Sequence, residues 1–256
     1  MRVLALETST EYCSVALWQD GVITQHCELV GQKHSELLIG MVAALLQDAG
    51  CCPQGVGRAV PAAKAATATL RIQDMDGIAY GSGPGSFTGV RIACGAVQGL
   101  ALGAGLPVSG ICTLLALAED SGKTRVIAAL DARMGEIYCA AYEKQQDGWV
   151  AVYEPCLCKP EDAPAVAGRD WFGSGSGFAT FNDALQARYS DQLIGVDAAA
   201  VPKAAAIAVL AAARFARGLG DDAALAQPFY LRDKVAFKTA EREQIAIEKS
   251  KLINHL

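Results

Sequence analysis

Hydrophobic and polar positions follow the same short pattern at two places in the chain. Residues 3–7 read Val-Leu-Ala-Leu-Glu and, after a polar turn, residues 11–17 read Glu-Tyr-Cys-Ser-Val-Ala-Leu. Residues 127–131 read Ile-Ala-Ala-Leu-Asp, and residues 136–142 read Glu-Ile-Tyr-Cys-Ala-Ala-Tyr. Each copy is a buried strand ending at an acid, then a strand beginning at a glutamate, then an Asp-Gly hairpin signal. This repeat, about 124 residues apart, predicts an internal duplication.

Between these strands, the spacing of apolar residues predicts further strands and amphipathic helices. In the first half we expect strands at residues 22–30, 78–80 and 107–110, and helices at residues 35–49, 88–103 and 113–120. In the second half we expect strands at residues 149–155 and 171–173, and helices at residues 178–188 and 204–217. Residues 51–73 indicate a loop with at most one weak helix. The alternation predicts an α/β fold of two βββαβα-type units, residues 1–124 and 125–256, whose mixed sheets are covered by helices.

Composition restricts the classes of protein that fit. Hydrophobic residues make up 52% of the 256 residues and charged residues only 19%, which excludes global disorder. The 22 Lys and Arg residues against 27 Asp and Glu residues give a net charge of −5. Because affinity for a phosphate backbone comes from Lys and Arg, the chain is a poor candidate for gripping nucleic acid by itself.

The nine cysteines show no spacing typical of a zinc site. Cys51-Cys52 is vicinal and Cys156-x-Cys158 is a close pair, but neither has a second pair that would complete four ligands. We therefore predict structural thiols in a reducing cytoplasm and no metal site.

The sequence also predicts where the protein works. The N-terminus has no signal-peptide pattern. Residues 92–118 carry no charge, but Pro107 and several glycines cut them into pieces that we expect to be too short to span a membrane. A cytoplasmic protein that does not enter a membrane is the expectation.

The stretch Gly81-Ser-Gly-Pro-Gly-Ser-Phe-Thr-Gly-Val-Arg91 follows a buried strand and opens a helix. Its glycines allow a backbone to come close to a partner, and Thr88 is expected to cap the helix. One interpretation is a phosphate or nucleotide loop at a helix N-terminus. The other is a tight strand-to-helix turn, because the stretch is neither a Walker P-loop nor GxGxxG.

The strand-end acids Glu7 and Asp131 with their turns resemble the two phosphate loops of actin-like ATPases and sugar kinases. Such loops need glycine with Ser or Thr so that backbone N–H groups cradle phosphate. Residues 8–10, Thr-Ser-Thr, have no glycine, and residues 132–135, Ala-Arg-Met-Gly, have no hydroxyl. A metal–nucleotide site built from these turns would be poor. The candidates for a degenerate nucleotide site are Glu7, Thr8, Ser9, Gly83, Gly85, Ser86 and Asp131.

Gly95, Gly99 and Gly103 recur at four-residue spacing in the helix expected at residues 88–103. A stripe without side chains lets another backbone approach closely. Each glycine also lowers helix propensity. We therefore predict that this helix belongs to a closely packed pair, either within the chain or between subunits.

Several of these segments together resemble one family. They are Leu4-Ala-Leu-Glu-Thr-Ser-Thr10, the Gly81–Ile92 stretch, Leu130-Asp-Ala-Arg-Met-Gly-Glu-Ile-Tyr138 and Tyr230-Leu-Arg232. They are similar to those of the TsaB family, also called YeaZ, and the resemblance runs from residue 1 to about residue 235. Residues 51–73 and the tail beyond Phe237 look longer than in that family.

The resemblance implies a bacterial cytoplasmic protein with the actin-like ATPase (ASKHA) fold. The family is needed to make N6-threonylcarbamoyladenosine in tRNA. Its members are not the catalyst and have no cofactor of their own. They pair with a paralogue, TsaD, which carries the metal, and the ATPase TsaE joins that pair. In the absence of TsaD they form homodimers, and they meet tRNA only through the partner.

The resemblance also implies where this chain lacks the paralogue's chemistry. The metal-binding His-x-x-x-His pair of TsaD falls here on about Thr113 and Leu117, and neither residue is such a ligand. The expected surface for TsaD, or for a second copy, lies on the helices at 35–49 and 88–103. Its residues are Leu38, Met41, Leu45, Val90, Gly95, Gly99 and Gly103.

Two other functions remain open from the residues. One is an autonomous ATPase or kinase of the same fold, which would use Glu7, Asp131 and the Gly83-Pro-Gly85 loop. The other is a structural homodimer with a different partner.

Overall fold

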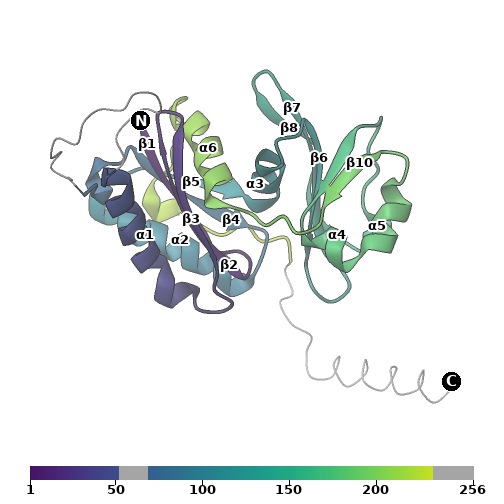
Figure 1. The fold of residues 1–256 in the computed structure, drawn as a ribbon, viewed down its shortest axis with the longest axis horizontal. Helices are drawn as coiled ribbons and strands as arrows, with labels where there is room; N and C mark the ends of the chain where they lie inside the picture. Colours follow the sequence, from purple (N-terminus) through teal and green to yellow (C-terminus); the bar gives the residue numbers. More distant parts are fainter. Residues whose placement is uncertain (52–68, 233–256) are drawn as a thin grey trace, which may run out of the picture.

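The computed structural model describes residues 1–51 and 69–232, which form two lobes (Figure 1). The first lobe holds a five-stranded sheet in the order β3-β2-β1-β4-β5. Its strands are β1 (Arg2–Glu7), β2 (Tyr12–Gln19), β3 (Val22–Leu29), β4 (Gly77–Gly83) and β5 (Val108–Cys112). β1 pairs with β2 antiparallel and with β4 parallel, so the sheet is mixed.

The second lobe repeats this topology with the order β10-β9-β6-β7-β8. Its strands are β6 (Arg125–Asp131), β7 (Ile137–Gln145), β8 (Gly148–Cys158), β9 (Trp171–Ser174) and β10 (Leu193–Asp197). β6 pairs with β7 antiparallel and with β9 parallel, as β1 does with β2 and β4. The predicted duplication is therefore confirmed in strand order and direction. β10, at the edge, was not predicted because its short run carries no clear alternation.

Helices cover both sheets. α1 (His34–Cys51) and α2 (Phe87–Ala104) pack on one face of the first sheet, and α3 (Thr113–Asp120) and α6 (Ala204–Phe215) pack on the other. In the second lobe the predicted helix at 178–188 is divided into α4 (Ser176–Thr180) and α5 (Asn182–Tyr189). Short 3-10 turns occupy Ile72–Asp74, Pro160–Asp162 and Ala223–Leu225. Residues 52–68 and 233–256, where a longer loop and tail were noted, lie outside the described residues.

α6 corrects the predicted division of the chain at residues 124 and 125. It follows the last strand of the second sheet but returns to the first lobe, as Figure 1 shows. Ile207 and Ala211 of α6 are fully buried in the same cluster as Val3 and Ala5 of β1. The apolar face of this Ala-rich helix is thus covered by the first sheet, so the first lobe takes residues from both ends of the chain.

α3 lies between the lobes. Ala116 packs in the cluster that contains α6, whereas Leu114 and Leu117 pack against the second sheet. Lys203, just before α6, forms an ion pair with Asp120 at the end of α3, with Nζ and Oδ2 2.9 Å apart. The two sheets are therefore joined through one shared layer of helix.

α2 corrects the expectation that every apolar segment of residues 92–118 is short. The helix runs from Phe87 to Ala104, one residue beyond the predicted 88–103 at each end, and its 18 residues are enough, by length and composition, to cross a membrane. One side of α2, including Val90, Ala93 and Val97, is buried against the first sheet. This packing is typical of a core helix in a globular lobe.

Candidate functional site

The turn after β1 and the glycine loop, residues 81–89, meet at one edge of the first sheet. β1 and β4 are parallel neighbours, with Leu6 opposite Tyr80, so the residues that follow them lie side by side. The structure thus brings together the predicted candidates of both segments. They are Glu7, Thr8, Ser9, Gly83, Gly85 and Ser86.

The two segments touch backbone to backbone. The Ser86 N–H donates to the Ser9 carbonyl oxygen at 2.7 Å, and the Thr8 hydroxyl donates to the Gly89 carbonyl oxygen at 2.7 Å. A Cβ on Gly85 would lie 2.6 Å from the Ser9 Cβ, and one on Gly89 would overlap the Thr8 carbonyl oxygen. The glycines of this loop therefore allow contact with the protein's own chain. Of the two interpretations, the geometry favours the tight strand-to-helix turn, because the turn after β1 occupies the approach to Gly85 and Gly89.

Ser86, and not Thr88, caps α2. The Ser86 hydroxyl accepts a hydrogen bond from the Gly89 N–H at 3.3 Å, whereas Thr88 is an exposed residue inside the first turn. The prediction for Thr88 was wrong by two residues because the helix starts one residue earlier than its apolar pattern. Ser86 is thereby engaged with the protein itself.

The far side of the loop is held by two elements that sequence reasoning did not connect to it. The Thr113 hydroxyl, at the start of α3, donates to the Pro84 carbonyl oxygen at 2.5 Å. The Phe229 N–H donates to the Ser82 carbonyl oxygen at 2.7 Å. Thr113 and the fully buried Leu117 are the residues on which the family resemblance was expected to place the paralogue's histidine pair. In this chain the Thr113 hydroxyl holds the glycine loop in place, and Leu117 packs in the core. No local sequence pattern predicts either contact.

Glu7 is a buried carboxyl group at the end of β1. Its Oε1 accepts a hydrogen bond from the Ser9 N–H, while Oε2 and the Ser9 hydroxyl oxygen have no partner among the described residues. Burial raises the pKa of Glu7 to about 7. A partly protonated carboxyl closed in by Gly81 is a poor ligand for a cation, and its ionised form would repel phosphate.

Asp131, the strand-end acid of the second lobe, is occupied by its own turn. Its Oδ1 accepts from the Arg133 N–H at 2.7 Å, and its Oδ2 pairs with the Arg133 guanidinium at 3.1 Å. The same guanidinium lies 3.3 Å from Oε1 of Glu11 in the first lobe. The polar contacts of Asp131 go to Arg133 and Ser176, and none goes to the glycine loop. Arginine thus stands in the turn where a phosphate loop would place open N–H groups.

The structure places the residues of the predicted partner surface in two different environments. Leu38, Met41, Leu45 and Val90 are at most 7% exposed and belong to the first core, so they cannot offer side chains to a partner; this part of the prediction is corrected. These side chains are buried because the apolar stripe of each helix faces the first sheet. Gly95, Gly99 and Gly103, called here the glycine stripe, are on the open side of α2, where an added Cβ would meet no atom of residues 1–51 or 69–232 within 4 Å.

Large apolar side chains are also exposed on α1 and α2. Leu102 on α2 is 60% exposed and Ile39 on α1 is 52% exposed. Gly40 on α1 is also open, with nothing within 4 Å of an added Cβ. α1 and α2 lie next to each other on the same face of the sheet (Figure 1). The pair therefore presents a surface of small and apolar residues beyond its buried stripe.

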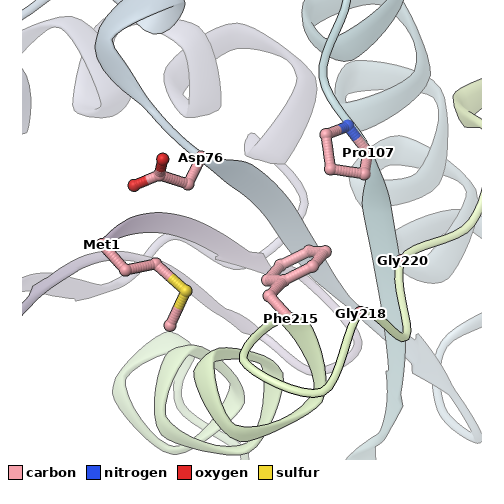
Figure 2. A pocket seen from close by; sticks show the side chains of 6 residues that line it. All are labelled: Met1, Asp76, Pro107, Phe215, Gly218 and Gly220. Carbon is pink, nitrogen blue, oxygen red and sulfur yellow. The ribbon is translucent and has the colours of Figure 1, made fainter.

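A separate hollow of about 470 Å³ lies at the opposite end of the first sheet. Figure 2 shows its lining residues, which are Met1, Asp76, Pro107, Phe215, Gly218 and Gly220. Its one acidic side chain, Asp76, accepts a hydrogen bond from the Arg2 N–H at 2.6 Å. The Asp76 carboxylate is already hydrogen-bonded, and the other lining residues are apolar or glycine. The lining of this hollow therefore does not bring catalytic side chains together.

Comparisons with known proteins agree with this geometry. "tRNA threonylcarbamoyladenosine biosynthesis protein TsaB" of Escherichia coli (strain K12) is 37% identical over 246 residues, which cover 93% of this chain and 97% of that protein. The protein of the same name from Haemophilus influenzae is 32% identical over 251 residues, 93% of this chain and 96% of that protein. The chain belongs to the TsaB family. The solved structure "YeaZ from Pseudomonas aeruginosa" has a TM-score of 0.76 at 36% identity, covering 90% of this chain and 99% of that one.

A second match connects the chain to the transferase. The family model for TsaD, tRNA N6-adenosine threonylcarbamoyltransferase, matches residues 57–239. Together with the two matched sheets and their helices, this confirms the α/β actin-like fold. Residues 57–239 of this chain thus resemble the TsaD family as well.

The contact between the glycine loop and the turn after β1 can be tested by two alanine substitutions on one helix. Gly89→Ala should lower the free energy of unfolding by about 1–3 kcal/mol, because the new Cβ meets the Thr8 carbonyl oxygen. Gly99→Ala is the control and should raise it by about 0.5–1 kcal/mol, since its Cβ enters open space. Urea unfolding of both variants measures the difference. Equal effects would contradict the close contact.

Glu7 predicts a particular pH dependence of stability. Folding raises the pKa of Glu7 from 4.5 to about 7, so the folded state favours the protonated carboxyl. The contribution of Glu7 to the free energy of unfolding is therefore present at low pH and is lost as pH rises from about 4.5 to about 7. Relative to Glu7→Gln, the native chain should lose about 3 kcal/mol of unfolding free energy between about pH 4 and about pH 8. Urea unfolding across this range measures it. A native curve parallel to that of the Gln variant would show that Glu7 does not titrate as described.

Proposed function

We propose that this chain is a non-catalytic subunit of the machinery that makes N6-threonylcarbamoyladenosine in tRNA. It pairs with TsaD through the open face of α1 and α2, and the ATPase TsaE joins the pair. Without TsaD the same face forms a homodimer. The assembly works in the cytoplasm, and tRNA is held mainly by the partner. The names of the Escherichia coli and Haemophilus influenzae relatives support the pathway.

The state of the two strand-end acids supports a role without catalysis. Glu7 is buried behind the glycine loop, and Asp131 is paired with Arg133. Thr113 and Leu117 stand at the positions of the metal-binding pair and are used for a hydrogen bond and for the core. Phosphate binding needs open N–H groups and catalysis of this kind needs a metal, and these residues provide neither.

The main support for pairing with TsaD through this face is the glycine stripe on the open side of α2. Helix interiors disfavour glycine, so three glycines at four-residue spacing weaken α2 without improving its own core. They do allow a second helix to approach the α2 backbone. TsaD matches this chain over residues 57–239, which include α2, so it carries an equivalent helix for such a contact.

Pairing can be tested by placing a bulky side chain in the stripe. Gly99→Leu should abolish co-purification with TsaD of the same organism, because the new side chain separates the two backbones. As a monomer it should be at least as stable to thermal unfolding as the native monomer, because no described residue lies within 4 Å of the new Cβ and leucine favours a helix more than glycine does. The same variant should sediment as a monomer where the native chain alone sediments as a dimer.

Ala187→Leu is the matched control. It adds the same side chain at an exposed position of α5, in the other lobe, and should co-purify with TsaD like the native chain. A Gly99→Leu chain that still co-purifies would exclude the stripe as the docking surface. Loss of binding in both variants would point to a general effect of added apolar surface.

The alternative is an autonomous ATPase or kinase. The isolated chain should hydrolyse ATP, with or without magnesium, far more slowly than about 1 s⁻¹, the low end of usual enzyme turnover. In contrast, reconstituted threonylcarbamoylation of tRNA by TsaD and TsaE should require the chain. Turnover by the chain alone at enzyme rates would overturn the proposal, as would full tRNA modification in its absence.

A further inference from the structure

Three thiols converge in the second lobe, two from β8 and one from the neighbouring strand β7. Cys156 and Cys158 are two residues apart on β8, so both side chains point to the same face of the sheet. Cys139 on β7 lies directly opposite Cys156 in the antiparallel register. Its sulfur is 3.5 Å from the sulfur of Cys156 and 3.5 Å from that of Cys158. All three ligand atoms lie within 4.8 Å of one another.

The surroundings of this thiol trio separate it from the glycine loop and the α1–α2 surface. Cys139 is buried, and Cys156 and Cys158 are partly exposed, so the trio has one closed and one open side. It packs in the cluster beneath α4 and α5, together with Tyr153 and Tyr189. Nothing in the proposed pairing with TsaD uses these residues.

We propose that Cys139, Cys156 and Cys158 form a binding site for one soft, thiophilic d¹⁰ metal ion, Zn(II) or Cu(I). Thiolate sulfur selects such ions over Mg²⁺ or Ca²⁺, which prefer oxygen ligands. With metal–sulfur bonds of about 2.3 Å, tetrahedral ligands stand roughly 3.8 Å apart, close to the spacing of the trio. Cu(I) is satisfied by three thiolates, whereas Zn(II) takes a fourth ligand, such as water, on the open side.

The fold supplies the spacing before any ion arrives. The hairpin register fixes Cys139 against Cys156, and the two-residue period of β8 fixes Cys158 beside it. Each thiol that binds releases its proton to solvent as the metal–sulfur bond forms, so binding must tighten as pH rises. No redox step is involved, and the ion keeps its charge.

The test uses the full chain, reduced and stripped of metal under nitrogen. Zn(II) and Cu(I) are titrated separately in competition with a chelator, and native mass spectrometry counts bound ions. We expect one ion per chain and a rise in melting temperature. Cys156→Ser and Cys158→Ser should each lower affinity by more than about 100-fold, because loss of a ligand outweighs the 10–100-fold effect of losing an outer partner.

Two control variants make the result specific. Cys27→Ser removes a partly buried thiol of the equivalent hairpin in the first lobe and should leave affinity unchanged. Cys51→Ser/Cys52→Ser removes the vicinal pair and should also leave it unchanged. The proposal is overturned if the vicinal pair proves to hold the ion, or if neither ion binds. A disulfide between two trio sulfurs, found in chain alkylated before lysis, would also overturn it.

Discussion

The structure depends on one close contact, between the turn after β1 and the glycine loop. Because Gly85 and Gly89 have no Cβ, the backbone at Ser9 and Thr8 comes within hydrogen-bonding distance of the loop. The contact fixes where α2 begins and therefore which side of α2 faces the sheet. It also leaves Glu7 enclosed. A loop composition that suggests a phosphate cradle is used here to join two parts of the same chain.

The two sides of α2 have opposite effects on its stability. Its inner side needs apolar contacts with the first sheet, which Val90, Ala93 and Val97 provide. Its outer side carries three glycines, and at roughly 0.5–1 kcal/mol each relative to alanine they weaken the helix by roughly 1.5–3 kcal/mol. That is a large share of the roughly 5–15 kcal/mol that stabilises a typical domain. Docking of a second helix on this face would return contacts that the isolated chain lacks.

Local sequence patterns predicted the strands and helices. They did not predict the contacts between segments that are distant in the chain. Repeated strands and amphipathic helices revealed the duplicated α/β fold, because period and turn signals are local. The same patterns cannot tell a core stripe from a partner stripe, so Leu38 and Leu45 were assigned to a surface although they are fully enclosed. The return of α6 to the first sheet and the contact of Thr113 with Pro84 follow from chain topology. The convergence of Cys139 with Cys156 required the hairpin register.

The two lobes carry different side chains at equivalent positions of their hairpins. By strand register, Ala16, Gln25 and Cys27 of the first lobe stand where Cys139, Cys156 and Cys158 stand in the second. In the first lobe α6 begins over this patch, where Gln25 accepts a hydrogen bond from the Ala205 N–H at 3.0 Å. In the equivalent patch of the second lobe, the Cys139 sulfur instead contacts the sulfurs of Cys156 and Cys158. Because the backbone frame is common to both lobes, the difference lies in the side chains and in what covers them. A thiol site there is thus a property of the second lobe, separate from the helix surface of the first.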